Sequence, residues 1–453
     1  MKKIEQSKYT HRLIARFVIE ADTPIAIGSG QKNIMTDALV ACDANGLPYL
    51  PASTIAGVVR SILQVEKESD LWGYQSKTHG HGSEIIFSEG KILGANSNVI
   101  DGLRVRDIIK EDSLLKEYAS LPIRQHVRIG HNGVTEDHGK FDEQVVFAGT
   151  RFCFEVEIVA DENNANAMKD VVNAVNADNF RLGGGTRCGL GKFRVVYARH
   201  CVLDLRKKDH LDLYLGKSSN LDNDSWWESF GTASVQIAKT SDIINYTLCL
   251  TPRDFIFFGS GFGDSEGDAD MTTVKERRVQ WTDDGHGKMT EDLVLIPASS
   301  VKGALRHRVV FHYNKKKGIW AKPGMTADEL KQFSHPQAVE ELFGYEKEGD
   351  TRPGHVYFSD IIQGKAVPKL LNHVSIDRFT GGTIDGALFT EQVDYLPKGT
   401  NYEMTISLDS TFEDEDLKCA FERALDDICE GLLPLGGGVS RGNGIFTGTR
   451  NLK

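Results

Sequence analysis

The chain has 453 residues, 40% of them hydrophobic and 26% charged, which suits two or three globular domains of a soluble protein. It has no apolar run long enough for a membrane span, its first residues lack the apolar core of a signal peptide, and its seven cysteines are scattered without a C-x-x-C pair. These features predict a cytoplasmic protein without a membrane partner or a cysteine-rich zinc site, while the net charge of −11 excludes only a uniformly basic binder of nucleic acid.

The first predicted elements are a strand over residues 9–28 and a helix that begins after Pro51. Apolar residues alternate along the strand, which runs into Gly28-Ser29-Gly30 and a flexible loop of about twenty residues. Ser53 is placed to cap the free amides at the helix start. The apolar positions of the helix then fall on one face: Ile55, Val58, Val59, Ile62 and Leu63.

The second half of the chain repeats this plan. A strand is predicted over residues 243–261, and a longer loop leads to a helix that begins after Pro297. The two helix starts match position by position, with Pro51, Ser53, Thr54, Gly57 and Arg60 against Pro297, Ser299, Ser300, Gly303 and Arg306. Three further pairs of segments match in order: 71–74 with 342–345, 126–133 with 373–380, and 143–145 with 391–393. An internal repeat of this length indicates two related units.

A glycine-rich stretch lies near the end of each unit, LGGGTRCGLGKF at 182–193 and LGGGVSRGNGIF at 435–446. Five glycines recur in register, and such backbone reaches positive φ at low cost and lets another molecule lie against its amides. Arg187 and Lys192 in the first copy and Arg441 in the second favour a polyanion as that molecule. For either copy alone, a glycine-lined turn beside a tightly packed strand explains the glycines equally well.

Each unit reads strand, helix, strand, irregular hairpin, strand, helix, glycine-rich loop and strand. This is the β-α-β-β-α-β order of the ferredoxin-like fold, so we predict an α+β protein with two such units in tandem. The units occupy residues 1–200 and 241–453, and residues 201–240, which contain Trp226-Trp227, form a linker.

Basic residues are concentrated in windows that contain no acidic residue. Residues 179–203 hold five Arg or Lys, residues 293–327 hold seven and residues 431–453 hold three, with no Asp or Glu in any of them. Two of these windows contain the glycine-rich stretches. Because charges beyond a Debye length are screened, such windows are suited to phosphate despite the negative total.

With its paired glycine-rich stretches and helix starts, the chain resembles the RAMP superfamily, the RNA-binding subunits of CRISPR effector complexes. It is most similar to backbone subunits of type III complexes, as if two had been fused. The resemblance implies RRM-like units that hold CRISPR RNA, complementary target RNA and other subunits of an antiviral ribonucleoprotein. The first unit has Ala56 where Lys is usual, so it should hold the RNA backbone less strongly. The residues that the resemblance places against RNA are Ser53, Thr54, Arg60, Gly184, Gly185, Arg187, Lys192, Ser299, Ser300, Lys302, Arg306, Gly437, Gly438 and Arg441.

The resemblance also identifies residues 126–145 and 373–393 as thumbs, β-hairpins that wedge into the guide–target duplex and displace one base each. It places His126 and Ile129 at the base of the first thumb and His373 and Ile376 at the base of the second. Apolar wedges can unstack bases for a few kcal/mol per step. The alternative is a surface loop of mixed polarity.

In cleaving members of this family, an aspartate in the loop after the first strand is needed to cut bound RNA, and Asp37 falls at that position. It would promote attack of a ribose 2′-hydroxyl on the adjacent phosphate by holding Mg²⁺ or Mn²⁺, by acting as a base or by orienting the hydroxyl. Without the family context, a lone aspartate in a loop is usually a turn or cap residue.

The corresponding residue of the second unit depends on how its longer loop is aligned. Aligning the turns that precede the two helices puts Glu276 in the place of Asp37, whereas a gap-free count back from the helix start gives Asp283. We favour Glu276, with Asp268 and Asp270 as weaker candidates. Because a glutamate reaches further than an aspartate, activity at this second site is doubtful.

We therefore expect a CRISPR RNA-binding backbone subunit that cleaves target RNA around Asp37 as a divalent-metal-dependent endoribonuclease. Two alternatives stay open: a non-catalytic structural subunit, and a guide-processing ribonuclease, which usually relies on a histidine or another acid–base group. His79 and His81 could form a metal-binding tract, although a flexible loop explains them better.

Overall fold

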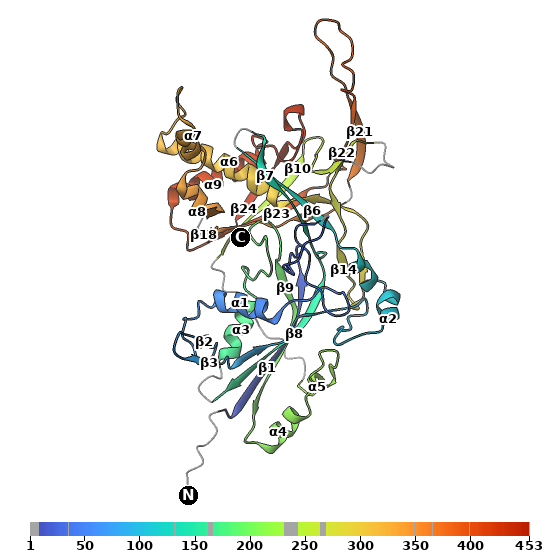
Figure 1. The fold of residues 1–453 in the computed structure, drawn as a ribbon, viewed down its shortest axis with the longest axis vertical. Coiled ribbons are helices and arrows are strands. Elements are labelled where there is room, and N and C mark those ends of the chain that lie inside the picture. The colour runs from blue at the N-terminus through green and yellow to red at the C-terminus, as the bar shows by residue number, and fades with distance from the viewer. Residues whose placement is uncertain are drawn as a thin grey trace.

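The computed structural model describes residues 9–34, 36–130, 133–161, 166–230, 243–262, 269–347, 350–364, 366–397 and 399–452. Two sheets with their helices follow one another along the long axis of the molecule, the first half of the chain in the lower part of Figure 1 and the second half in the upper part. The molecule is therefore α+β, as predicted.

The first sheet has the strand order β4-β8-β1-β9, with β5 also paired to β8. Its strands and helices are β1 (His11–Ala21), β4 (Ile85–Phe87), β5 (Lys91–Ile92), β8 (Arg151–Ala160), β9 (Phe193–Asp204), α1 (Ala52–Ile62) and α3 (Ala167–Val175). The alternating residues of β1 point into the core beneath the helices, and Phe17 stacks on Phe154 with ring centroids 5.0 Å apart. The strand ends at Ala21 rather than near Gly28, and the chain continues to Gly28 through isolated bridges.

The second sheet repeats this topology with the order β19-β23-β10-β24. Its strands and helices are β10 (Ile243–Pro252), β19 (Val356–Tyr357), β23 (Tyr402–Asp409), β24 (Phe446–Leu452), α6 (Ala298–Lys317) and α9 (Glu415–Cys429). In both sheets the first strand lies between the third and the fourth, and the pairings are antiparallel. This arrangement confirms two ferredoxin-like units in tandem.

The described part of the predicted linker covers the outer face of the first sheet. It contains α4 (Lys208–Leu215) and α5 (Ser225–Glu228). Trp226 and Trp227 are buried with Ile14, and the Trp227 indole N–H donates to Glu155 over 2.9 Å. Because the linker covers this face, β1 is buried on both sides.

The helix starts differ from the prediction in one respect, because Ser53 and Ser299 do not cap them. Pro51 and Pro297 occupy the N-cap positions, and neither helix receives a hydrogen bond from an N-cap side chain. At α6 the Asp360 carboxylate accepts from the Ala298 N–H over 2.7 Å and takes over the capping role.

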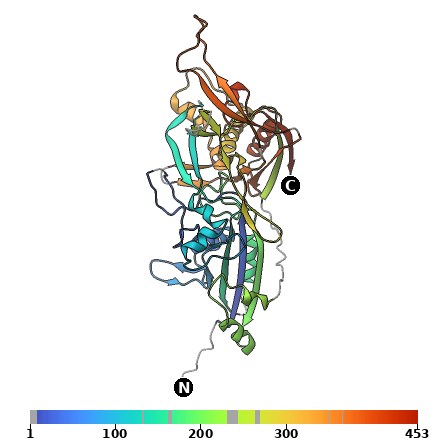
Figure 2. The same cartoon turned by 90° about the vertical axis from the view of Figure 1, so that its right-hand side faces the viewer.

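Two long hairpins occupy the positions predicted for the thumbs. The first is formed by β6 (Ile123–Ile129) and β7 (Thr135–Gln144). The second, formed by β21 (Val367–His373) and β22 (Phe389–Tyr395), belongs to a sheet with β11 (Gly259–Phe262) and β12 (Met271–Thr273). Its tip projects far beyond the rest of the molecule (Figure 2).

A hairpin from the second unit crosses into the first. It is formed by β14 (Val279–Trp281) and β15 (Gly287–Met289), and Val279 is buried in the core of the first unit. The Val279 N–H donates to Ala148 O over 2.8 Å, and the Trp281 indole N–H donates to Gly149 O over 2.7 Å. The two units therefore share part of one core.

The remaining elements are short and lie between these parts. They are β2 (Tyr74–Gln75), β3 (Gly80–His81), α2 (Arg106–Glu111), β13 (Lys275–Glu276), β16 (Leu293–Ile296), α7 (Ala327–Ser334), α8 (Gln337–Phe343), β17 (Gly344–Lys347), β18 (Asp350–Pro353), β20 (Ile361–Ile362) and the 3₁₀ turns Leu115–Ala119 and Val439–Arg441.

Candidate nucleic-acid interface

Asp37 lies at the foot of the first thumb, held against strand β7. The Asp37 N–H donates to Asp142 O over 3.0 Å, and the Asp142 N–H donates to Asp37 Oδ2 over 3.0 Å. The next residue, Ala38, forms a parallel bridge with Glu143. The Asp37 side chain is exposed, so its carboxylate has a fixed position and faces solvent.

Asp270 has the same setting at the foot of the second thumb. Its N–H donates to Thr390 O over 3.0 Å, and its Oδ2 accepts from the Thr390 N–H over 2.7 Å and from the Thr390 hydroxyl over 3.0 Å. Met271 pairs with Glu391 in parallel register, as Ala38 pairs with Glu143. These hydrogen bonds lower the pKa of the exposed Asp270 carboxyl.

The register of the hydrogen bonds thus matches Asp270 with Asp37, and the alignment that favoured Glu276 is wrong. The turns at Gly46 and Gly285 do correspond, since both are closed by the same backbone hydrogen bonds. Gly285, however, lies fifteen residues after Asp270, whereas Gly46 lies nine after Asp37, so carrying the turn alignment back without a gap gives the wrong partner. Asp268, the neighbouring candidate, lies outside the described residues.

Glu276 lies in the contact between the two units, and Asp283 lies in the turn of the β14–β15 hairpin. Glu276 is 5% exposed and accepts from Arg124 Nε over 2.6 Å, and Asp360 lies 3.1 Å from the same guanidinium. Burial raises the pKa of the Glu276 carboxyl. Asp283 is exposed at the turn between β14 and β15, where Gly285 O accepts from Ser97 of the first unit over 2.5 Å.

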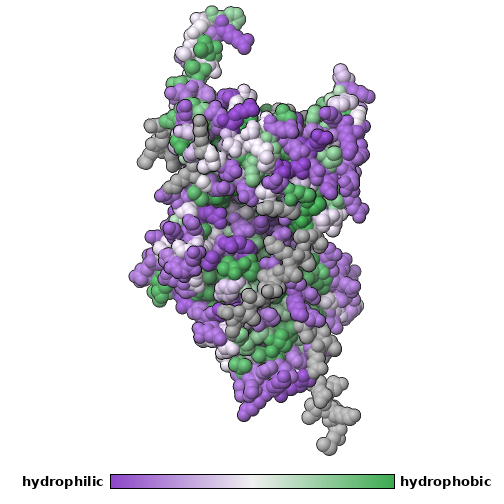
Figure 3. Space-filling view, turned by 180° about the vertical axis from the view of Figure 1, so that it is seen from behind, coloured by the Kyte–Doolittle hydropathy of each residue, from purple (hydrophilic) through white to green (hydrophobic). Residues whose placement is uncertain are grey.

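The thumbs have histidines in their strands and apolar residues further out. His126 lies within β6, and His373 is the last residue of β21. Ile129 and Ile376 lie beyond the histidines, beside the turn or in the loop, and not at the base as predicted. They are 58% and 61% exposed, and the tip of the second thumb carries apolar as well as polar side chains (Figure 3).

The glycine-rich loops are anchored to their own units by equivalent hydrogen bonds. The Gly184 N–H donates to Ala26 O over 2.7 Å, and the Gly437 N–H donates to Phe257 O over the same distance. Gly185 and Gly438 both adopt positive φ, at 65° and 67°. The amides of Gly184 and Gly437 are therefore used within the fold and cannot be offered to phosphate unchanged.

The basic residues of the first loop and of α6 contact protein at the joint. Arg187 Nε donates to Gly354 O over 2.7 Å, and its guanidinium carbon lies 3.7 Å from the centroid of the Tyr357 ring. Lys302 Nζ lies 3.7 Å from Cys188 Sγ, and burial lowers the pKa of this amine.

The other basic residues predicted to contact RNA differ in how exposed their side chains are. Arg60 donates to the carbonyls of residues 66, 67 and 73, and Arg306 lies 3.8 Å from Glu340 with its pKa lowered by burial. Lys192 lies 4.0 Å from Asp22. Arg441, which is 43% exposed and 2.6 Å from Glu391, is the most open of these groups.

At the two helix starts, Ser53 and Ser300 are exposed, whereas Thr54 and Ser299 are half-buried. Their hydroxyls are consequently not all equally accessible to a backbone phosphate.

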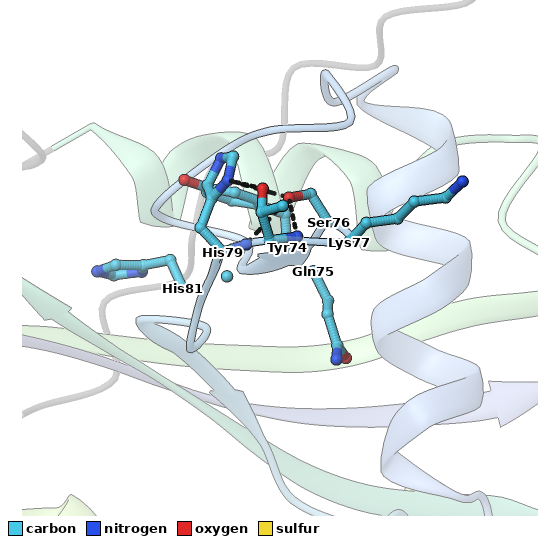
Figure 4. A pocket seen from close by; sticks show the side chains of 8 residues that line it. Tyr74, Gln75, Ser76, Lys77, His79 and His81 are labelled. Carbon is cyan, nitrogen blue, oxygen red and sulfur yellow. Dashed lines mark hydrogen bonds between the residues drawn. The ribbon is translucent and has the colours of Figure 1, made fainter.

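The histidine tract of residues 79–81 lies in the β2–β3 hairpin. His79 Nδ1 lies 3.1 Å from both the Ser76 and Thr78 hydroxyls, while His81 points away from it (Figure 4). No group of three side chains suited to a metal ion occurs in the described part of the chain. This arrangement favours the loop interpretation.

Comparison with known proteins identifies one family. A family model described as the RAMP superfamily matches residues 18–194 and 285–447, one segment in each unit. A search of curated proteins found no match. Among the described helices, none has the length and apolar character needed to cross a membrane.

Proposed function

This chain belongs to the RAMP superfamily of CRISPR RNA-binding proteins, and we propose that it is a two-unit backbone subunit of a type III effector complex that cuts target RNA at the foot of each thumb. The observation that carries this proposal is the pair of exposed aspartates, Asp37 and Asp270, held by the same backbone hydrogen bonds in both units. A cutting site beside each thumb requires equivalent carboxylates in the two units, and Asp37 and Asp270 meet that requirement.

The chemistry is attack of a ribose 2′-hydroxyl on the adjacent phosphate, which needs a flipped or distorted nucleotide. A thumb supplies that distortion, because exposed apolar side chains such as Ile129 and Ile376 can unstack a base step. An aspartate at the foot of the hairpin then lies beside the strained phosphodiester. Its fixed carboxylate can orient the 2′-hydroxyl for in-line attack.

The residues present also fit a divalent cation. Mg²⁺ usually keeps several waters and binds through one or two carboxylates together with substrate phosphates. Asp37 offers an exposed carboxylate of which one oxygen is hydrogen-bonded to backbone, and Asp270 offers the same in the second unit. When bound there, Mg²⁺ or Mn²⁺ would offset the charge that develops on the phosphate.

The test is cleavage of end-labelled target RNA by the assembled complex with its guide. Asp37→Ala should remove one product and Asp270→Ala another, each by about 10²–10⁴-fold, and the double variant should lose both. Asp283→Ala is the matched control, because it removes a loop carboxylate at the joint, and its products should be unchanged. Full cleavage by the double variant with RNA still bound would leave a non-catalytic structural subunit as the better account.

A further inference from the structure

A histidine–glutamate pair lies at the foot of each thumb. His126 Nε2 lies 2.8 Å from Glu143 Oε1, and the imidazole stacks on Phe141 with ring centroids 4.6 Å apart and planes 12° apart. In the second thumb, His373 Nε2 lies 3.1 Å from Glu391 Oε2, and the ring stacks on Phe389 at 4.8 Å and 25°.

The strand register brings each pair next to its aspartate. His126 pairs across the hairpin with Phe141, the residue before Asp142, whose N–H holds Asp37. His373 pairs with Phe389, the residue before Thr390, whose N–H holds Asp270. In both units the glutamate is also the bridge partner of the residue after the aspartate.

These pairs are largely buried, yet each imidazole keeps part of its surface open to solvent. The histidine side chains are 16% and 25% exposed, and their glutamate partners 15% and 0%. Each glutamate lies on the Nε2 side of its ring, which orients the ring and leaves Nδ1 as the atom for a second partner. The charged groups around His126 are Glu143, Arg124 of the same strand face and Asp360 of the second unit.

We propose that His126 and His373 donate the proton that the departing 5′-oxygen needs during RNA cleavage, each held in place by its glutamate. This inference rests on the proposed function. The 2′-oxygen forms a bond to phosphorus and gives its proton to a water hydrogen-bonded to the aspartate. The P–O5′ bond breaks, the 5′-oxygen takes a proton from the imidazolium, and the products are a 2′,3′-cyclic phosphate, a 5′-hydroxyl and a neutral imidazole.

The two histidine–glutamate pairs differ in whether the glutamate also contacts an arginine. Arg441 contacts Glu391 at 2.6 Å, whereas the aligned residue of the first glycine-rich loop is Cys188. Glu391 therefore divides its carboxylate between an arginine and His373. We expect the first site to depend more strongly than the second on its histidine–glutamate pair.

The test uses the assembled complex and two target RNAs, one normal and one with a bridging 5′-sulfur at the first cutting position. A thiolate leaves without protonation, so loss of a proton donor matters little for the sulfur substrate. His126→Ala should slow the first cut of normal RNA by about 10²–10⁴-fold, leave the second cut unchanged, and cut the sulfur RNA within a few-fold of the wild-type rate. His126→Gln is the control for a structural effect of alanine, because glutamine keeps a hydrogen-bonding group towards Glu143. It should also slow the first cut of normal RNA and leave cleavage of the sulfur RNA nearly unchanged.

Equal losses on both substrates would overturn the inference and leave His126 as a structural residue. The inference is also overturned if both His126 variants make the first cut at the normal rate while Asp37→Ala does not make it. In that case the proposed function survives. If Asp37→Ala and Asp270→Ala both cut normally, the proposed function itself fails.

Discussion

The two glycine-rich loops have the same glycine spacing and different surroundings. The first is packed against the second unit, where Gly189 forms a parallel bridge with Ser359 and Arg187 contacts Gly354 and Tyr357. In the second loop, Arg441 contacts Glu391 of its own unit and is 43% exposed. One loop thus forms a joint within the chain, and the other is open to an external molecule.

The shared spacing comes from packing within each unit. A Cβ on Gly191 would lie 2.1 Å from Leu182 O, and one on Gly444 would lie 1.9 Å from Leu435 O. Both glycines also adopt φ of 74°, which L-residues rarely adopt. The glycine pattern therefore reports a tight turn beside a strand, and the residues between the glycines determine what the loop contacts.

The largest test of this comparison is to break the joint that holds the first loop. Arg124→Ala should lower the free energy of unfolding by about 3–5 kcal/mol, because it leaves the buried carboxylates of Glu276 and Asp360 without a cation. Urea unfolding of the isolated chain measures the loss. Arg128→Ala is the control, since that exposed side chain pairs only loosely with Glu136, and it should change stability by less than about 0.5 kcal/mol.

Equal effects of the two substitutions would mean that the buried cluster does not hold the units together. The docked state of the first loop would then depend on the β14–β15 hairpin and on the loop's own contacts with Gly354, Tyr357 and Ser359.

Local patterns predicted most of the fold. The alternating residues of β1 and the apolar faces of α3 and α9 lie in the cores where the sequence places them, because burial follows strand and helix periodicity. The position of Asp37 in the loop after the first strand could be predicted, whereas its hydrogen bonds to β7 at the foot of the first thumb could not.

Long-range contacts were not predictable. The match between Asp270 and Asp37 became visible only through hydrogen bonds to β7 and β22, because the second loop has extra residues between its aspartate and the turn that corresponds to Gly46. Arg187 meets Tyr357 across the joint, and nothing near either residue in the sequence signals that contact. The histidine–glutamate pairs are likewise formed across strands, although the repeated Glu-Gln-Val segment was a usable signal for half of each pair.

A second test removes the arginine of the docked loop. Arg187→Ala should lower the free energy of unfolding by about 1–2 kcal/mol, because it removes one hydrogen bond and a cation–π contact in a half-buried position. Arg423→Ala, an exposed arginine on α9, should change it by less than about 0.5 kcal/mol. A stability loss without a change in the salt dependence of RNA binding would assign Arg187 to the joint. A change in the salt dependence of RNA binding without a loss of stability would instead indicate that Arg187 contacts RNA.

The smallest expected effect concerns the open loop. Arg441→Gln removes one positive charge and keeps a hydrogen-bonding group beside the buried Glu391. If Arg441 neutralises one phosphate of single-stranded RNA, the slope of log K against log salt should fall by about 0.7 in magnitude. The measurement is RNA binding by the complex over a salt series in an Asp37→Ala, Asp270→Ala background, which prevents the proposed cleavage during the titration.

The control for this measurement is Arg423→Ala, which should leave the slope unchanged, because a charge that does not release a counterion cannot contribute to it. If the slope is also unchanged for Arg441→Gln, Arg441 only neutralises Glu391. The open loop then contacts a neighbouring protein or nothing. Packing within the unit would in that case fully explain the glycine spacing.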